Sequence, residues 1–225
     1  MNPSLSLAGI GMTSRRTRAR MIDRLRARGI ADETVLAAMN AVPRHIFVEE
    51  ALSSHAYDDM ALPLGFGLNQ TTTISQPYIV ARMLEILLNG RRSPGKTLEV
   101  GAGCGYQSAV LGHLSRDVYA VERIEPLLAR ARRNLAQLPD IRVHLKHADG
   151  GLGLPEAVPF DSIIVSAAAT AVPQDLLRQL APDGILVLPV GGSEQYLYRI
   201  ERTSQGFVET RLESVRFVPL LVGLA

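Results

Sequence analysis

The chain has 225 residues, of which 47% are hydrophobic and 20% charged, the balance of a globular protein that is long enough to bury a full core. No apolar run reaches the roughly 18 residues of a membrane-spanning helix, and the single cysteine, Cys104, excludes an intrachain disulfide. The first eleven residues lack the basic start and long apolar stretch of a signal peptide. We therefore expect a cytoplasmic protein without a membrane span.

The formal net charge is only +2, but it is unevenly spread. Residues 15–28, RRTRARMIDRLRAR, hold seven arginines against the single Asp23, so this segment carries +6 and the rest of the chain sums to −4. Such a segment could bind nucleic acid or an acidic partner, or it could be the solvated face of a helix. We favour the solvated helix and do not expect a nucleic-acid partner, because no aromatic residues interleave with the arginines. Residues 1–14 are interpreted as a flexible extension.

The segments that follow predict a helical cap and a loop. Helices are expected over 15–28 and 32–41, with Asp32 as the N-cap of the second. The stretch 61–77, ALPLGFGLNQTTTISQP, contains glycine and proline breakers and a threonine run, which predict a loop. Pro77 then opens a third helix, since proline is well placed in the first turn.

The remaining chain alternates between strands and helices. Segments such as 163–165 and 185–188 are continuously apolar, as expected of parallel strands covered by helices on both faces. The tail at 195–220 instead predicts antiparallel strand pairs. The expected fold is a doubly wound, Rossmann-like α/β core at 96–225 with the cap and its loop before it at 15–95, in one compact unit. The expected strands lie at 97–101, 118–122, 141–146, 160–167 and 184–190, and the expected helices at 105–115, 125–138 and 173–180.

A glycine-rich turn follows the first strand of this core, in KTLEVGAGCGYQ. Gly101, Gly103 and Gly105 stand at alternate positions, which lets the chain turn sharply and lets a ligand approach the main chain. Nicotinamide dinucleotide binders instead show G-x-G-x-x-G, and here the third glycine position is Tyr106. The loop also lacks a basic residue for phosphate. The pattern therefore favours a cofactor with little or no phosphate.

Acidic residues follow or precede this loop at the carboxyl ends of predicted strands, where open α/β sheets bind ligands. Glu122 ends the second strand and can accept hydrogen bonds from both ribose hydroxyls of an adenosine. Asp149, followed by Gly150, could accept from an adenine amino group. Glu99 could anchor loop amides or face the cationic end of the cofactor. Together these features predict S-adenosyl-L-methionine as the cofactor.

The chain resembles the protein-L-isoaspartate O-methyltransferases over residues 15–225, with the shared stretches in the same order. The glycine-loop signature is common to many methyltransferases, whereas VPRHIFV, TISQPYIVA and VRFVPL are specific to this family. The stretches that carry the resemblance are LEVGAGCGYQSAVL (98–111), VYAVERI (118–124), FDSIIVSAAA (160–169), LPVG (188–191), VRFVPL (215–220), RGIADETVLAAMNAVPRHIFV (28–48), AYDDMALPLG (56–65) and TISQPYIVARM (73–83).

The resemblance implies the S-adenosylmethionine-dependent methyltransferase fold and a protein-repair reaction. The methyl group of S-adenosyl-L-methionine would move onto the free α-carboxylate of L-isoaspartyl residues in damaged proteins and peptides. The ester then closes to a succinimide, which reopens partly as normal aspartate. The chain departs from the family in a longer link at 66–72, FGLNQTT, and in having no tryptophan after the Asp149–Gly150 pair, where bacterial members often carry one.

The chemistry of this reaction asks for orientation rather than for a base. A carboxylate is already ionised at pH 7, and a sulfonium leaves without protonation. The resemblance makes Ser75 the functional serine, whose hydroxyl can donate to the acceptor carboxylate. The competing interpretation is that Ser75 caps the helix that Pro77 opens, and both roles can hold at once.

The resemblance also implies which segments bind the substrate peptide. Thr73 would be a second donor near Ser75. Two segments would lie along the peptide and hold it by main-chain hydrogen bonds, which suits an enzyme that accepts many damaged proteins. Their residues are Ala61, Leu62 and Pro63 in the first, and Val215, Phe217 and Val218 in the second.

Other chemistries find little support in the residues. His144 and His147 point to opposite faces of a predicted strand, so we expect no metal site. No G-x-S-x-G motif is present to support acyl-transfer hydrolysis, and Cys104 is interpreted as a small buried residue. Two alternatives stay open: a methyltransferase acting on another acceptor, and a non-catalytic cofactor-binding protein whose basic arm binds nucleic acid.

Overall fold

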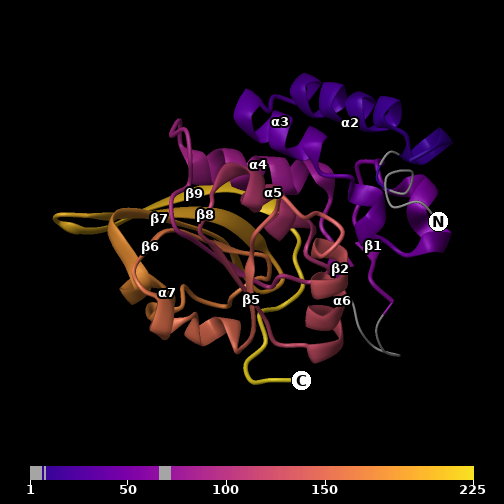
Figure 1. Cartoon of the computed structure of the whole chain (residues 1–225). Coiled ribbons are helices and arrows are strands. Elements are labelled where there is room, and N and C mark those ends of the chain that lie inside the picture. The colour runs from indigo at the N-terminus through magenta and orange to yellow at the C-terminus, as the bar shows by residue number, and fades with distance from the viewer. Residues whose placement is uncertain (1–6, 8, 66–71) are drawn as a thin grey trace.

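The computed structural model describes residues 7, 9–65 and 72–225 (Figure 1). Of the extension expected at 1–14, residues 1–6 and 8 lie outside the described residues, and of the lengthened link at 66–72, residues 66–71 do. Within the described part of the chain, no helix is long and apolar enough to cross a membrane.

The N-terminal part of the chain forms a helical cap, drawn in indigo in Figure 1. Helix α2 buries Met21 and Leu25 toward the rest of the cap and exposes most of its arginines, as a solvated helix face does. Asp32 caps α3 as predicted, because its side chain accepts from the backbone N–H groups of Thr34 and Val35. The cap elements are the 3-10 turn η1 (Gly11–Thr13), α2 (Arg15–Ala27), α3 (Glu33–Ala41), and the 3-10 turns η2 (Arg44–Phe47) and η3 (Glu50–His55).

The segment predicted as a loop at 61–77 contains two short strands. β1 (Leu62–Pro63) and β2 (Thr73–Ile74) pair antiparallel, so the prediction of a loop is wrong for these residues. Each strand has only two residues, too few to give a periodic pattern, so the strands could not be predicted from the sequence. Helix α4 (Pro77–Leu88) follows at once, with proline in its first turn as predicted.

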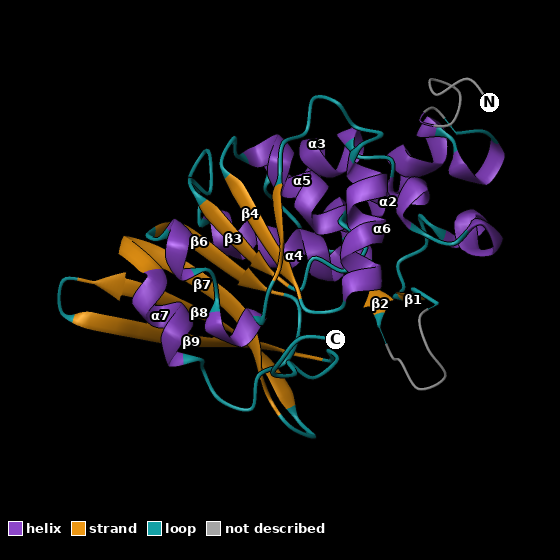
Figure 2. Cartoon of the chain, turned by 60° about the horizontal axis from the view of Figure 1, so that its bottom comes forward, coloured by secondary structure: helices purple, strands orange, loops and turns teal. Residues whose placement is uncertain are grey.

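The core is a seven-stranded sheet in the order β5-β4-β3-β6-β7-β8-β9 (Figure 2). The first five strands of this order run parallel, and β8 and β9 run antiparallel at one edge, as the tail pattern predicted. The strands are β3 (Thr97–Val100), β4 (Val118–Glu122), β5 (His144–His147), β6 (Phe160–Val165), β7 (Leu180–Gly191), β8 (Gln195–Thr203) and β9 (Gly206–Val215).

Helices cover both faces of the sheet, which confirms the doubly wound α/β fold. Helices α4, α5 (Tyr106–Leu114) and α6 (Glu125–Leu135) pack with the cap on one face. Helix α7 (Gln174–Gln179) and the 3-10 turns η4 (Gly150–Leu152) and η5 (Pro155–Ala157) cover the other. Within β6, Ile164 belongs to the first apolar core, and Ile163 and Val165 belong to the second. A continuously apolar strand is therefore the result of burial on both sides.

Two strands begin at other residues than predicted. β5 begins at His144 rather than at 141, because Ile141 closes a turn onto Leu138 and packs against helix α5 beside Gly112. β7 begins at Leu180 rather than at 184, since Leu180 already pairs with Phe160 across an irregularity in the register. In both cases a contact between distant segments decided where the strand begins.

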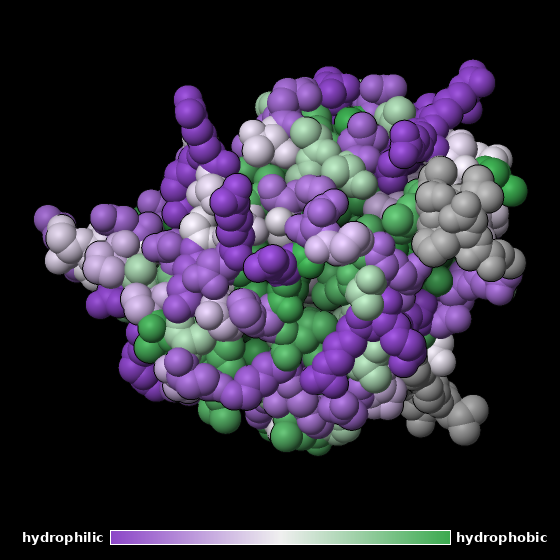
Figure 3. Space-filling model, in the orientation of Figure 1, coloured by the Kyte–Doolittle hydropathy of each residue, from purple (hydrophilic) through white to green (hydrophobic). Residues whose placement is uncertain are grey.

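Beyond β9 the chain crosses the carboxyl edge of the parallel strands. Ala168 exchanges backbone hydrogen bonds with Val218 and Leu220, and the backbone of Ala225 bonds with Arg123 and Glu125. The C-terminal segment therefore lies beside the residues that follow β6 and the start of α6, and Figure 1 draws the C-terminus near α6. On the face seen in Figure 3, hydrophilic side chains predominate and apolar ones gather near the middle.

Candidate active site

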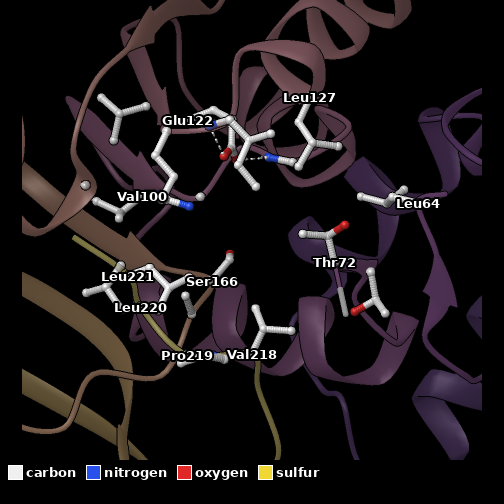
Figure 4. A pocket seen from close by; sticks show the side chains of 18 residues that line it. Leu64, Thr72, Val100, Glu122, Leu127, Ser166, Val218, Pro219, Leu220 and Leu221 are labelled. Atoms are coloured by element: carbon white, nitrogen blue, oxygen red, sulfur yellow. Dashed lines mark hydrogen bonds between the residues drawn. The ribbon is translucent and has the colours of Figure 1, made fainter. Parts of the chain in front are cut away.

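A cavity of about 220 Å³ opens at the carboxyl ends of β3, β4 and β6 (Figure 4). β3 pairs with β4 on one side and with β6 on the other; β3, β4 and β5 follow one another in one direction, and β6 and β7 follow in the other, so the strand order reverses beside β3. Such a switch point is where open α/β sheets bind ligands. The cavity is lined by Val100, Gly101, Gly103, Val121, Glu122, Gly150 and Ser166 from the core, and by Val218–Leu221 from the C-terminal segment.

The glycine-rich turn has the conformation that its sequence predicts. Gly101, Gly103 and Gly105 have φ values of +89°, +56° and +88°, a region that residues with a Cβ atom rarely adopt. A Cβ at Gly105 would also lie 3.2 Å from the Cβ of Ala131 on α6. The turn therefore needs glycine for its backbone, and at Gly105 also for helix packing.

Glu122 lies at the cavity wall with its side chain 5% exposed. Its Oε2 accepts from the backbone N–H of Gly103 and its Oε1 from that of Ile124, both at 2.9 Å, as drawn in Figure 4. Each carboxylate oxygen can accept a further hydrogen bond. Glu122 is thus fixed by the main chain and keeps acceptor capacity for two hydroxyl groups.

Of the neighbouring residues Asp149 and Gly150, only Gly150 lines the cavity. Gly150 lines the cavity, and a Cβ there would lie 2.3 Å from Val100 Cγ1. Asp149 is not among the residues that line it, because its Oδ1 accepts from Gly151 N at 2.9 Å and its Oδ2 from Gly223 N at 2.5 Å. The carboxylate that the sequence suggested for adenine therefore holds the C-terminal segment in this structure.

Glu99 does not anchor amides of the glycine-rich turn, as the sequence had suggested it could. It is 1% exposed and accepts from Gln107 Nε2 at 3.1 Å and from the hydroxyl of Ser108, both on α5. The pKa of Glu99 is raised to about 8, mainly by burial; the hydrogen bonds from Ser108 and Gln107 act to lower it, and the nearby Glu122 acts to raise it. At pH 7 this carboxyl group is mainly uncharged.

This raised pKa predicts a pH dependence of stability. Below pH 4.5 Glu99 is protonated in both states; as the pH rises to about 8, only the unfolded chain loses the proton, which favours unfolding. The free energy of unfolding of the native chain relative to Glu99→Gln should therefore fall on the order of 4 kcal/mol across this window. Urea unfolding at several pH values measures it, and a constant difference would refute the raised pKa.

A narrow polar cavity of about 50 Å³ adjoins the first and contains Ser75. It is lined by Ser75, Glu99, Tyr106, Gln107 and Ser166, among others. A wider groove of about 360 Å³ opens from the same turn to the surface.

Ser75 is not the N-cap of α4, which is Gln76, and the Gln76 side chain makes no capping hydrogen bond. In the first turn, Asp59 Oδ1 instead accepts from Tyr78 N at 2.9 Å. The competing interpretation of Ser75 as a helix cap is therefore wrong. Its side chain lines both the narrow cavity and the groove. Thr73 lines the first cavity, the narrow cavity and the groove.

The residues expected to bind peptide are only partly brought together. Ala61, Phe217 and Val218 line the groove. Leu62, Pro63 and Val215 are not among its lining residues. Leu62 is buried in the β1–β2 pair, and Val215 ends β9.

The main chain at Phe217 is already hydrogen-bonded inside the protein. The Gln195 side chain accepts from Phe217 N and donates to Phe217 O, and Val218 O accepts from Ala168 N. These groups are occupied in this structure, so side chains rather than these main-chain groups face the groove.

Ser166 is a site residue that the sequence analysis missed. It follows β6 directly, lies at the meeting of all three cavities, and accepts from Gln107 Nε2 at 2.9 Å. Figure 4 shows its side chain directed toward the first cavity. Its position at the carboxyl end of a buried strand was the signal that could have found it.

The remaining reactive side chains do not form a second centre. Cys104 is buried, and burial raises the pKa of its thiol. His144 and His147 lie at the two ends of β5, and His147 contacts Glu125. Among residues 7, 9–65 and 72–225, no group of three or more His, Cys, Asp or Glu side chains is placed to hold a metal ion.

The first cavity fits a nucleoside with an amino-acid tail. The glycine cradle, the acceptor capacity of Glu122 and the apolar side chains of Ile124, Leu127 and Leu221 suit a ribose and a purine. The absence of lysine or arginine from the glycine-rich turn does not suit a pyrophosphate. A site of this kind, on a doubly wound sheet with an antiparallel edge, is characteristic of the S-adenosyl-L-methionine-dependent methyltransferases.

Comparison with known proteins narrows this class to one family. A profile of the protein-L-isoaspartate(D-aspartate) O-methyltransferase family matches residues 16–224. The chain therefore belongs to that family. It is 69% identical to the protein-L-isoaspartate O-methyltransferase of Dechloromonas aromatica, over 96% of this chain and 99% of that one. It is 59% identical to the one of Methylobacillus flagellatus, over 98% of both.

Two solved structures of protein-L-isoaspartate O-methyltransferases have the same fold as this chain. A protein-L-isoaspartate O-methyltransferase from Plasmodium falciparum, in complex with S-adenosyl-L-homocysteine, superposes with a TM-score of 0.77 at 26% identity, over 91% of this chain and 98% of that one. Another protein-L-isoaspartate O-methyltransferase superposes with a TM-score of 0.83 at 25% identity, over 92% of this chain and 67% of the other.

Proposed function

We propose that this chain moves a methyl group from S-adenosyl-L-methionine to the free α-carboxylate of L-isoaspartyl residues in damaged proteins. The observation that carries the proposal is the connection of three cavities at Ser166. A cofactor cavity, a narrow polar cavity with Ser75, and a groove open to the surface meet there. A peptide in the groove could present a carboxylate beside Ser75 while the rest of the protein substrate stays outside.

The residues of the chain have a positioning task in this reaction. S-adenosyl-L-methionine supplies the methyl group, and the acceptor carboxylate is already ionised at pH 7. Ser75 can donate a hydrogen bond to the acceptor oxygen that does not react, and Thr73 can donate from the adjoining wall. Holding reacting groups in line can supply roughly 7–11 kcal/mol of the barrier. No general base is needed, because the ionised carboxylate has no proton to remove.

The proposed partners are proteins and peptides that contain L-isoaspartate. The groove supports this proposal, because an open groove with few charged groups can accept peptides of many sequences. Ala61, Ile79, Phe217 and Pro219 give it apolar walls, and among the described residues that line it only Arg216 is charged. Such walls suit many sequences around the damaged residue. We place the reaction in the cytoplasm, because the only cysteine is a buried thiol that fits a reducing compartment.

A pair of synthetic peptides tests the function. The chain should transfer labelled methyl groups from S-adenosyl-L-methionine to a peptide with L-isoaspartate, and should leave the same peptide with L-aspartate unmethylated. The product should be a base-labile ester. Turnover only on an unrelated acceptor would favour a different methyltransferase. No turnover, with salt-sensitive nucleic-acid binding, would favour a binding protein.

A further inference from the structure

Arg44 is a fully buried arginine in the cap, at the start of η2. Its Nε donates to Ala56 O at 2.8 Å, and its Nη2 donates to Ser75 O at 2.7 Å. Its guanidinium lies 4.7 Å from the centroid of the Tyr106 ring. Within the described part of the chain, Nη1 has no hydrogen-bond partner. The side chain thus connects the cap to the turn that carries Ser75.

The charge of Arg44 is not balanced by a carboxylate. The groups whose charges act on it are Tyr106, Cys104 and Tyr57. Burial raises the pKa of all three, to about 12 for Tyr106, so they are neutral at pH 7. Burial lowers the pKa of Arg44, but arginine keeps its proton in proteins. A buried charge without an opposite charge beside it costs stability, which points to an anion that arrives from outside.

The positive charge of Arg44 acts on the narrow cavity. Ser75, Cys104 and Tyr106 line that cavity, and all three are neighbours of Arg44. Glu99 lines the same cavity, and its raised pKa leaves it mainly uncharged at pH 7, so it does not cancel the positive charge. The guanidinium therefore stands directly behind the wall at which an acceptor carboxylate would bind.

We propose that Arg44 is the buried counter-charge for the acceptor carboxylate, and that it positions Ser75 through the Ser75 carbonyl group. The inference rests on the proposed function. The carboxylate loses its charge when the ester forms, so the attraction strengthens binding of the acceptor and weakens for the neutral product. The charge should therefore act on acceptor affinity, and the hold on Ser75 should act on turnover.

The test compares two peptides and three variants. One peptide carries L-isoaspartate and the other carries isoasparagine, in which a neutral carboxamide replaces the α-carboxylate. Each is titrated by calorimetry into the protein saturated with S-adenosyl-L-homocysteine. Arg44→Met and Arg44→Gln remove the charge, and Arg44→Lys keeps it. Two neutral variants are used in case one fails to fold, and their affinity for S-adenosyl-L-homocysteine reports an intact core.

The native protein should bind the carboxylate peptide roughly tenfold more tightly than the carboxamide peptide, as expected of one charge acting across several ångströms of protein. Either neutral variant should lose this preference by binding the carboxylate peptide less tightly, with the carboxamide affinity unchanged. Arg44→Lys should keep the preference but turn over more slowly, because lysine cannot hold both Ala56 and Ser75 carbonyl groups in the same geometry.

Three results would overturn the inference. A neutral variant that keeps the native preference would show that the charge does not act on the acceptor. An equal loss of affinity for both peptides would show a purely structural role. Arg44→Lys with native turnover would exclude the positioning of Ser75. Failure of the proposed function is distinguishable from all three, because the native protein itself would then bind neither peptide.

Discussion

Ser75→Ala should lower kcat/KM for methylation of an isoaspartyl peptide by roughly 10- to 100-fold, the loss expected when a reacting group is no longer held in line. The hydroxyl is expected to orient the carboxylate rather than to stabilise developing charge, because the reaction removes charge from the acceptor. The affinity for S-adenosyl-L-homocysteine should stay within about twofold, since Ser75 lines the narrow cavity and the groove but not the cofactor cavity.

Ser166→Ala removes a second hydroxyl at the meeting of the same cavities, so a larger loss in Ser75→Ala than in Ser166→Ala would show that the position of the Ser75 hydroxyl matters. Ser75→Thr, which keeps a hydroxyl group, should recover part of the lost turnover. Initial rates with a saturating cofactor measure all three variants. If Ser75→Ala turned over at the native rate, Ser75 would have no role in methyl transfer.

Glu122→Ala should weaken the binding of S-adenosyl-L-homocysteine by roughly one hundredfold, the scale of lost hydrogen bonds to a charged group. Two effects combine here. The ribose hydroxyls would lose their acceptor, and the backbone N–H groups of Gly103 and Ile124 would lose the carboxylate that fixes the glycine-rich turn. Calorimetry measures the affinity, and thermal unfolding confirms that the variant is folded.

Glu125→Gln is the control for this substitution. Glu125 lies at the start of α6, is half exposed, forms an ion pair with Arg132 and contacts the His147 ring, outside the cofactor cavity. Its neutralisation should leave the affinity nearly unchanged. If Glu122→Ala bound as tightly as the native chain, the ribose assignment would be wrong.

Much of the fold was predictable from local sequence. The N-cap at Asp32, the proline at the start of α4 and the positive φ values at Gly101, Gly103 and Gly105 each follow from the chemistry of a residue and its neighbours. The short β1–β2 pair and the starts of β5 and β7 did not follow. They depend on partners that are distant in the sequence, so no local pattern records them.

In the candidate site, too, some residues could be predicted from local sequence and others could not. Glu122, Gly101 and Gly103 were placed correctly at the cavity by strand ends and spacing, because every parallel strand presents its carboxyl end to the same edge. Gly105 does not line the cavity and packs against Ala131 of α6 instead. The bonding of Asp149 to Gly223, of Gln195 to Phe217 and of Arg44 to Ser75 could not be predicted. Each of these joins segments that meet only after folding.

The sequence by itself determined the class of fold, the cofactor and the reaction, because apolar periodicity, glycine spacing and family motifs are properties of neighbouring residues. The tertiary structure alone decided which polar groups remain available to a ligand and which are used inside the protein. It also decided that Glu99 is buried and mainly uncharged and that Arg44 is buried without a carboxylate. Burial and partnership set pKa and binding capacity, and both depend on the packing of the whole chain.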